Sequence, residues 1–213
     1  ATEAYAMGRV SINNPLGEMW STAILELEIV PPNGANVVWE WHLWDHLVQD
    51  SDPSLPGYGV ISEHPELMDI NAGDIGGGGG PTGVNADWMH INAIDYNPLL
   101  DQIVISSRGQ DEIYIIDHST TTEEAAGHTG GNSGKGGDFL YRWGNPSKYE
   151  RGSTLSQKLF DQHGVNWIKE GYPGGGNLIL YNNNYGNRTS AVFEIVPPLD
   201  TDSINYIIND TDP

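Results

Sequence analysis

Two stretches of the chain repeat one order of elements, and each begins with a histidine. His90 leads into a strand at 102–106, and His163 leads into a strand at 177–181. A second strand follows in both copies. A repeat of this length cannot bury both faces of its small sheet alone, so successive copies have to pack against one another. The chain is therefore predicted to stack several small antiparallel sheets.

Short strands make up nearly all the regular structure that the sequence predicts. Each is rich in β-branched or aromatic residues and is bounded by Gly, Pro, Asn or Asp. Helical patterns are limited to Thr122–Ala126 and a turn at 156–160, so the predicted fold class is all-β. The predicted strands are 23–30, 36–41, 102–106, 112–116, 139–143, 177–181 and 191–196.

The strands fall into three blade-like units of a single domain, 1–213. Small sheets repeated at this spacing favour a β-propeller, whose sheets bury their faces against their neighbours. A β-sandwich is the alternative, but it requires no histidine at the start of successive units. At roughly 40–50 residues per blade, three units form about half of a propeller, so a partner chain segment or a homo-oligomer is expected to complete it. The units are 20–50, 87–145 and 160–208, with long loop insertions at 50–87 and 120–137.

Charge and composition exclude several kinds of partner. The formal net charge of −20 repels nucleic acid and anionic membrane surfaces, and the nine Lys and Arg residues form no cluster that overrides it. No apolar run approaches the roughly 18 residues of a membrane helix. The chain has no cysteine, which excludes thiolate metal sites and cysteine nucleophiles. A small-molecule site remains, and an anionic substrate would need one of the few cations, such as Arg108.

Five segments of the chain are similar, in order and in spacing, to consecutive stretches of a known enzyme family. They are Asp87-Trp-Met-His-Ile-Asn-Ala-Ile-Asp-Tyr-Asn97, Asp101-Gln-Ile-Val-Ile-Ser-Ser-Arg108, Ile116-Asp-His-Ser119, Gly137-Asp-Phe-Leu-Tyr-Arg-Trp-Gly-Asn145 and Gln157-Lys-Leu-Phe-Asp-Gln-His163. With these segments, between about Val37 and Pro198, the chain resembles the bacterial arylsulfotransferases, which transfer a sulfuryl group from an aryl sulfate ester to a phenol. The resemblance implies a six-bladed β-propeller in the periplasm or outside the cell that uses no cofactor.

The resemblance also implies roles for individual residues. His163 matches the histidine that accepts the sulfuryl group and becomes a sulfohistidine. His90 and Asn92 match a His-x-Asn pair on an inner strand, and Arg108 matches the arginine that follows them. The expected catalytic residues are thus His163, His90 and Arg108, with Asn92 binding substrate. The family carries a further histidine in the preceding blade, whereas residues 1–22 contain none.

These residue types suit the chemistry of a sulfate ester. An arginine offers a planar set of donors that fits two sulfuryl oxygens, and a neutral imidazole can attack sulfur. Phenols have a pKa of about 10, so a phenolate leaves readily and aryl esters are the natural donors. The rings of Trp88 and Tyr96 are candidates for stacking on the aryl group.

Two other functions stay open at this point. A structural or ligand-binding propeller would keep the scaffold without turnover, and the missing histidine favours that alternative. A calcium-dependent propeller hydrolase would need a cluster of carboxylates at the channel.

Two further motifs are set aside as sites. His42 and His46 have the spacing of a helical metal pair, but no glutamate follows His42, and no metal site is predicted. The glycine-rich stretch 127–137 lacks the strand and helix of a phosphate loop and is interpreted as a flexible surface loop.

Overall fold

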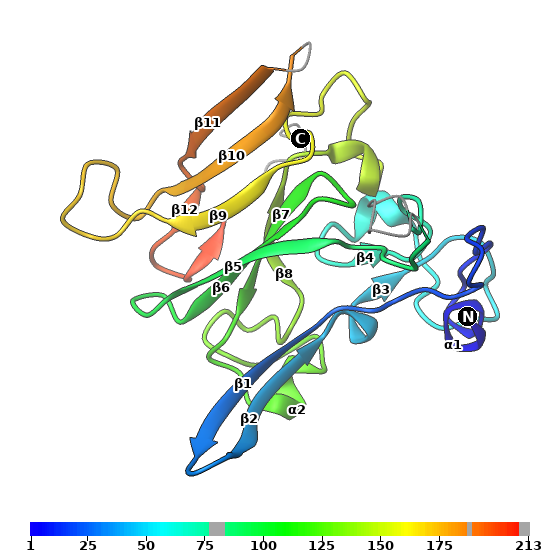
Figure 1. The fold of residues 1–213 in the computed structure, drawn as a ribbon, viewed down its shortest axis with the longest axis horizontal. Helices are drawn as coiled ribbons and strands as arrows, with labels where there is room; N and C mark the ends of the chain where they lie inside the picture. The colour runs from blue at the N-terminus through cyan, green and yellow to red at the C-terminus, as the bar shows by residue number, and fades with distance from the viewer. Residues whose placement is uncertain (77–83, 187–188, 209–213) are drawn as a thin grey trace.

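The computed structural model describes residues 1–76, 84–186 and 189–208, and it confirms the all-β class (Figure 1). Residues 77–83 of the predicted insertion at 50–87 lie outside the described residues. The helices are short and lie at the edges of the sheets. They are α1 (Thr2–Ala6), α2 (Thr122–Ala125) and the 3-10 turns η1 (Leu43–Asp45), η2 (Ile61–Glu63) and η3 (Pro146–Tyr149).

The centre of the molecule is a four-stranded antiparallel sheet in the order β5-β6-β7-β8. Every residue of β6 and β7 is buried, because both faces of this sheet are covered. Strands buried on both faces have continuous apolar runs, as residues 113–116 show in the sequence. The strands are β5 (Ile91–Asn97), β6 (Gln102–Ser107), β7 (Glu112–Asp117) and β8 (Phe139–Trp143).

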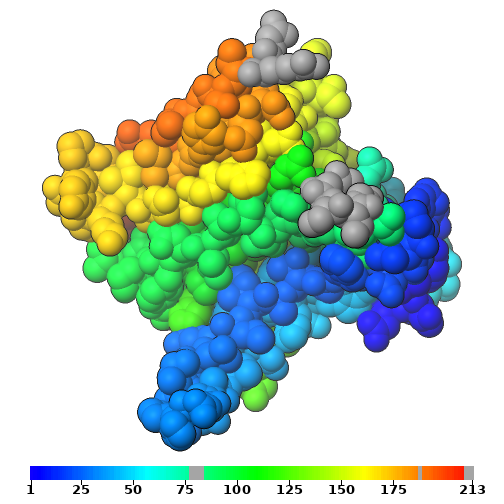
Figure 2. Space-filling model, viewed as in Figure 1, coloured from blue at the N-terminus to red at the C-terminus, as the bar shows by residue number. Residues whose placement is uncertain are grey.

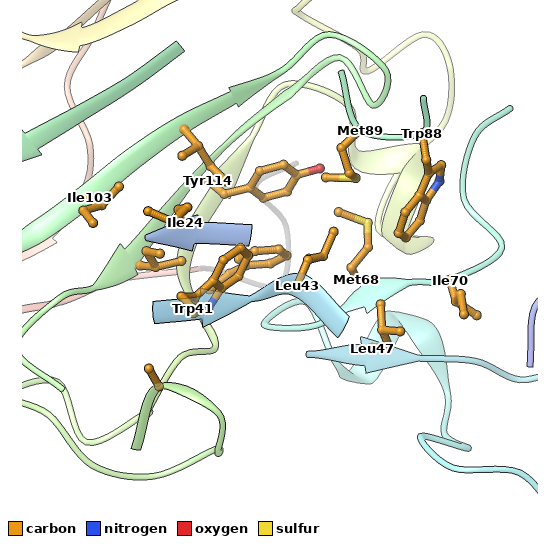
Figure 3. Packing of buried hydrophobic residues seen from close by; sticks show 14 of the residues in the cluster. Ile24, Trp41, Leu43, Leu47, Met68, Ile70, Trp88, Met89, Ile103 and Tyr114 are labelled. Carbon is orange, nitrogen blue, oxygen red and sulfur yellow. The ribbon is translucent and has the colours of Figure 1, made fainter. Parts of the chain in front are cut away.

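Alternation along the central strands divides the apolar side chains between two cores. Ile103 and Tyr114 point into one core, which also holds Trp41 of β2 (Figure 3). Val104 and Ile115 point into the other core. Successive side chains of a strand face opposite sides of its sheet, so the central sheet lies between two separate hydrophobic layers.

A three-stranded sheet in the order β11-β10-β9 covers one face of the central sheet. Strands β5 and β9 lie side by side, and the backbone N–H of Trp167 donates to Oδ2 of Asp95 at 2.8 Å. Strands β5 and β9 were not among the strands predicted from the sequence. The three strands are β9 (His163–Trp167), β10 (Leu178–Tyr185) and β11 (Thr189–Ile195), and a small pair, β12 (Leu199–Asp200) and β13 (Asn205–Tyr206), follows them.

A two-stranded hairpin of β1 (Ala23–Val30) and β2 (Gly34–His42) lies on the other side of the central sheet. It projects from the body of the molecule, where Figure 2 shows it in blue. The base of the hairpin is buried through Trp39 and Trp41, whereas most of its outer half is exposed. The parallel pair β3 (Leu47–Val48) and β4 (Met68–Asp69) connects it to the central sheet.

The described residues form an open arrangement of sheets, without a closed ring. Two local predictions differ from the structure. The turn at 156–160 contains no helix, and the stretch 127–137, although a loop with mostly exposed or partly exposed residues, is held against the hairpin. It packs on the hairpin, because the indole N–H of Trp41 donates to the carbonyl oxygen of Gly137 at 2.7 Å.

Candidate functional site

A cleft of ≈ 470 Å³ opens where the chain enters β5 and leaves β6. Its walls come from three parts of the chain that are distant in sequence, namely the connection after β4, the β6–β7 turn and the segment before β9. Two of the predicted catalytic residues line it. The lining residues are Asn71, Gly73, Asp74, Asp87, Trp88, His90, Arg108, Gly109, Asp111, Lys148 and Asp161.

His90 is held in the cleft by Asp87. Oδ1 of Asp87 accepts the backbone N–H of His90 at 2.9 Å, and Oδ2 lies 2.5 Å from Nδ1 of the ring. The backbone of His90 is left-handed, with φ 48°, a conformation that costs energy for a residue with a Cβ and persists where surrounding contacts impose it. Asp87 thus fixes the ring nitrogen that carries its proton, and the half-buried imidazole has a set orientation.

Arg108 faces the same cleft from the end of β6. Its backbone N–H donates to the carbonyl oxygen of His90 at 3.1 Å, and its Nη2 forms an ion pair with Oδ1 of Asp161 at 2.8 Å. The next residue has to be glycine, since a Cβ on Gly109 would overlap the carbonyl oxygen of Trp88. This close approach of the two backbone segments brings the side chains of His90 and Arg108 to the same wall of the cleft.

The segment 161–163 connects the cleft to the neighbouring strands. The amide of Asn92 donates to the carbonyl oxygen of Gln162 at 2.7 Å. The Gln162 side chain is fully buried, and its Nε2 donates to the carbonyl oxygens of Ser107 and Glu112 at 2.8 and 2.9 Å. Buried amides of this kind fix a backbone segment in one position. Asn92 therefore helps to fix the segment that carries His163. Among the described residues, the Oδ1 atom of Asn92 is buried without a hydrogen-bond partner.

His163 begins β9 and does not itself line the cleft, although Asp161, two residues before it, does. Its Nδ1 lies 3.0 Å from the carbonyl oxygen of Asp161 and 2.8 Å from Nδ2 of Asn183. The two polar contacts are both made to Nδ1, so Nε2 is the ring nitrogen left for a ligand. Two predicted residues, Asn92 and Arg108, thus contact the segment 161–163, which ends in the third, His163.

Carboxylates outnumber cations in the cleft. Asp111 accepts the backbone N–H of Asp161 at 2.8 Å, and burial, together with the neighbouring charge of Asp161, raises the pKa of Asp111. Lys148 and Arg108 supply the positive charge. Within the described parts of the chain, no three of these aspartates bring their oxygens close enough together to share a metal ion.

Neither of the two predicted aromatic rings is available for stacking in the cleft. Trp88 forms the floor of the cleft, but its side chain is fully buried and its indole N–H donates to the carbonyl oxygen of Ala72 at 2.7 Å. Figure 3 shows the ring among the core residues Met68 and Met89. Tyr96 stands at the opposite end of β5, where its hydroxyl donates to Asp101 at 2.8 Å. The structure brings neither ring to a position from which it can stack on an aryl group in the cleft.

The model of the arylsulfotransferase (ASST) family matches residues 24–211. The chain belongs to the arylsulfotransferase family. No curated protein and no solved structure matches it significantly. In the part of this arylsulfotransferase-family chain that the structure describes, no helix is both long and apolar enough to span a bilayer.

Sequence reasoning missed the residues that orient the candidate site of this arylsulfotransferase-family protein. Asp87 holds His90, and the carbonyl of Asp161 contacts His163 while its carboxylate pairs with Arg108. Both aspartates stand two or three positions before a candidate histidine, which is a signal that the sequence does contain. Only the fold shows that the second one reaches Arg108.

Proposed function

We propose that this protein transfers a sulfuryl group from an aryl sulfate ester to a phenol, with the reaction at the cleft of His90 and Arg108. The observation that carries the proposal is that Asn92 and Arg108 both contact the segment 161–163, which carries His163, in a chain of the arylsulfotransferase family. Acyl or phosphoryl chemistry has no comparable support from these residues.

In the proposed first step, Nε2 of His163 attacks sulfur. The new S–N bond forms as the S–O bond to the aryl group breaks, and the phenolate leaves with the electron pair. The step requires the tautomer with its proton on Nδ1, which can donate to the carbonyl of Asp161 and leaves the lone pair on Nε2. In the second step an acceptor phenol attacks the sulfohistidine, its oxygen forms the new S–O bond, and the S–N bond breaks. Dividing the transfer in this way replaces one difficult step by two easier ones.

His90 is the proposed proton carrier between the two steps. It donates a proton to the leaving phenolate and takes one from the acceptor phenol, so the charges balance over one turnover. The carboxylate of Asp87 supports the protonated ring and fixes its orientation. Phenolates need only modest assistance of this kind because the phenol pKa is about 10.

Arg108 is proposed to bind the oxygens of the sulfuryl group. In the structure its guanidinium pairs with Asp161, so a sulfate group would have to take over this arginine from the carboxylate. A sulfate ester offers several oxygens to a planar guanidinium and can form a bidentate pair. Asn92 is proposed to support the site by holding the segment 161–163, since its amide is already donated to Gln162.

We further propose that the hairpin, the four-stranded sheet and the three-stranded sheet are consecutive blades of a six-bladed propeller. Their face-to-face packing around two cores is the packing of neighbouring blades. The units 20–50, 87–145 and 160–208 form about half of such a ring, and a partner segment or a second copy completes it. The proposed location is the periplasm or the cell exterior, following the family.

The test is an assay with a chromogenic aryl sulfate and a phenol, followed by mass spectrometry of the protein. Wild type is expected to carry a sulfuryl adduct on His163 when the acceptor is omitted. His163→Ala should lose at least about a thousandfold of the transfer rate, because no other group forms the intermediate. The matched control is His64→Ala, a histidine paired with Glu66 and outside the cleft.

The assay also distinguishes sulfuryl transfer from the alternative function, a propeller that binds ligands without turnover. That alternative predicts binding of an aryl sulfate that Arg108→Ala weakens, with no adduct on any histidine. Full transfer by His163→Ala would overturn the proposed mechanism. A calcium-dependent hydrolase gains no support from the cleft, because its aspartates do not converge in the described residues.

A further inference from the structure

Two histidines and an aspartate meet away from the cleft, between the hairpin and the stretch 127–138. Nδ1 of His46 and Nδ1 of His128 each lie 2.8 Å from the same oxygen, Oδ1 of Asp138. The three ligand atoms lie within 4.8 Å of one another. None of the three residues lines the proposed sulfuryl-transfer cleft.

The surroundings of His46 require a cation at this point. The ring is fully buried, and its Nε2 lies 2.8 Å from the carbonyl oxygen of Ala125. A carbonyl can only accept, so Nε2 carries a proton and the neutral ring presents a lone pair at Nδ1. That lone pair faces the carboxylate of Asp138, which is also an acceptor. Two acceptors at hydrogen-bond distance need a positive charge between them, either a second proton or a metal ion.

The other contacts of His46 hold its ring in the geometry of a metal ligand. A ligating histidine usually donates its second ring N–H to a carbonyl or carboxylate, as His46 does to Ala125. Trp41 stacks on the imidazole with an interplanar angle of 4°. On the side toward the stretch 127–138, a Cβ on Gly137 would lie 2.6 Å from Nε2. The glycine therefore allows the backbone to close over the ring.

His128 supplies a second nitrogen from the open side. Its side chain is 60% exposed, whereas that of Asp138 is 8% exposed. The stretch between them is folded back on itself, since Gly137 N–H donates to the carbonyl oxygen of Gly127 at 3.0 Å. This turn places His128 and Asp138 against His46, although 92 residues separate His46 from Asp138 in the sequence.

We propose that His46, His128 and Asp138 bind one divalent transition-metal ion of the zinc class. Two imidazoles and a carboxylate are borderline ligands that favour such ions over Ca²⁺ or Mg²⁺, which prefer oxygen donors. Ligands of a tetrahedral zinc ion lie roughly 3.3 Å apart, so a small expansion of the cluster admits the ion. Solvent reaches the fourth position past His128. The ion fastens the stretch 127–138 to the segment that follows the hairpin.

The experiment measures metal binding by the full chain, apart from any enzyme activity. The protein is stripped with a chelator, dialysed against Zn²⁺ and analysed for bound metal, and titrated calorimetrically. One Zn²⁺ per chain is expected, with a higher melting temperature than the stripped protein and no displacement by excess Ca²⁺ or Mg²⁺. Co²⁺ should give the visible absorption of a tetrahedral site.

His128→Ala is the main variant, because an exposed side chain can be removed without disturbing the core. It should weaken Zn²⁺ binding at least about a hundredfold and abolish the Co²⁺ spectrum. Asp138→Asn should weaken binding as well. The matched control is His42→Ala, an exposed histidine 3.3 Å from the carboxylate of Glu40, which should leave binding unchanged.

Two results would overturn the metal site. One is less than half an equivalent of Zn²⁺ on the wild-type chain, which would mean that a proton occupies the position between His46 and Asp138. The other is equal binding by His128→Ala and His42→Ala, which would place the ion on scattered surface carboxylates.

Discussion

The central sheet and the β1–β2 hairpin are made of similar strands and differ in what covers them. All positions of β6 and β7 are buried, whereas Ile24 is the one buried residue of β1. Leu25 and Leu27 are 49% and 50% exposed, although a residue of the same kind in β6 would be fully enclosed. The apolar residues of a strand thus show that the strand can pack in a core, but the elements around the strand determine whether it is buried.

The difference carries over to the charged residues of the two regions. Glu112 of β7 and Arg142 of β8 form a buried ion pair, with side chains 0% and 2% exposed, and the guanidinium also lies over the ring of Tyr149 at 4.0 Å. On the hairpin, Glu26 reaches His118 at 3.2 Å with its side chain 54% exposed. Charge pairs in the two regions should therefore respond very differently to loss of one partner.

The largest effect is expected from Glu112→Gln. This change leaves the buried guanidinium of Arg142 without its carboxylate and should lower the free energy of unfolding by about 3–5 kcal/mol, measured by urea denaturation. Glu26→Gln on the hairpin is the matched control and should change it by less than about 1 kcal/mol. Equal effects would contradict the contrast between the two regions.

Truncation of apolar side chains sharpens the same comparison. Ile115→Ala removes a fully buried side chain from the core between the central and three-stranded sheets and should cost about 2–4 kcal/mol. Leu25→Ala on the half-exposed hairpin should cost less than about 1 kcal/mol. Thermal melts of both variants test this, and a costly Leu25→Ala would show that the hairpin is covered in solution.

The sequence predicts the strands of both regions well, because the strand signal is local. The predicted strand at 139–143 coincides with β8, and the predicted helix at 122–126 coincides with α2 but for its last residue. Strand β5, which starts at the cleft, contains only partly buried and exposed residues. Its polar residues, Asn92 and Asp95, weaken the strand pattern, and both make contacts with the neighbouring sheet that the sequence cannot reveal.

The candidate sites show the same limit. Family resemblance predicts His90, Arg108 and His163; the structure places His90 and Arg108 in one cleft, and Arg108 pairs with the segment that carries His163. The pairing of Arg108 with Asp161 joins residues that are distant in sequence, and the meeting of His46 with Asp138 does so too. From the sequence, His46 is considered only with His42, and no metal site is predicted there because no glutamate follows His42. The fold gives it different partners, and local spacing carries no information about them.

The connection between the two regions should make stability depend on pH. Burial raises the pKa of Asp69 on β4 to about 6, above its ordinary 3.8. The folded protein therefore holds this proton more tightly than the unfolded chain, so its contribution to stability is complete below pH 4 and is lost as the pH rises through 6. Between pH 4 and pH 7 this loss amounts to up to about 3 kcal/mol of the free energy of unfolding, and Asp69→Asn should abolish it.

Asp200 provides a control of opposite sign for that measurement. Hydrogen bonds from Ser203 and from the backbone of Asp202 lower the pKa of Asp200, so its contribution is present at neutral pH and lost as the pH falls. As the pH rises from acid to neutral, the denaturant midpoint of Asp69→Asn should rise relative to that of wild type. The midpoint of Asp200→Asn should fall relative to that of wild type over the same range. A flat difference for Asp69→Asn would contradict the burial of its charge.

The smallest effect on stability is expected at the tip of the hairpin, where the comparison began. Leu27 and Ile29 are 50% and 72% exposed, and replacing both by Ser should change the free energy of unfolding by less than about 1 kcal/mol. If a further blade or a second copy covers this apolar face, as the proposed propeller requires, the double variant should shift self-associated protein toward monomer in sedimentation experiments. The paired change Thr2→Ser and Asp202→Asn, away from the hairpin, should leave the distribution unchanged. Association that persists in the Leu27 and Ile29 variant would place the missing contact on the opposite edge, at β11.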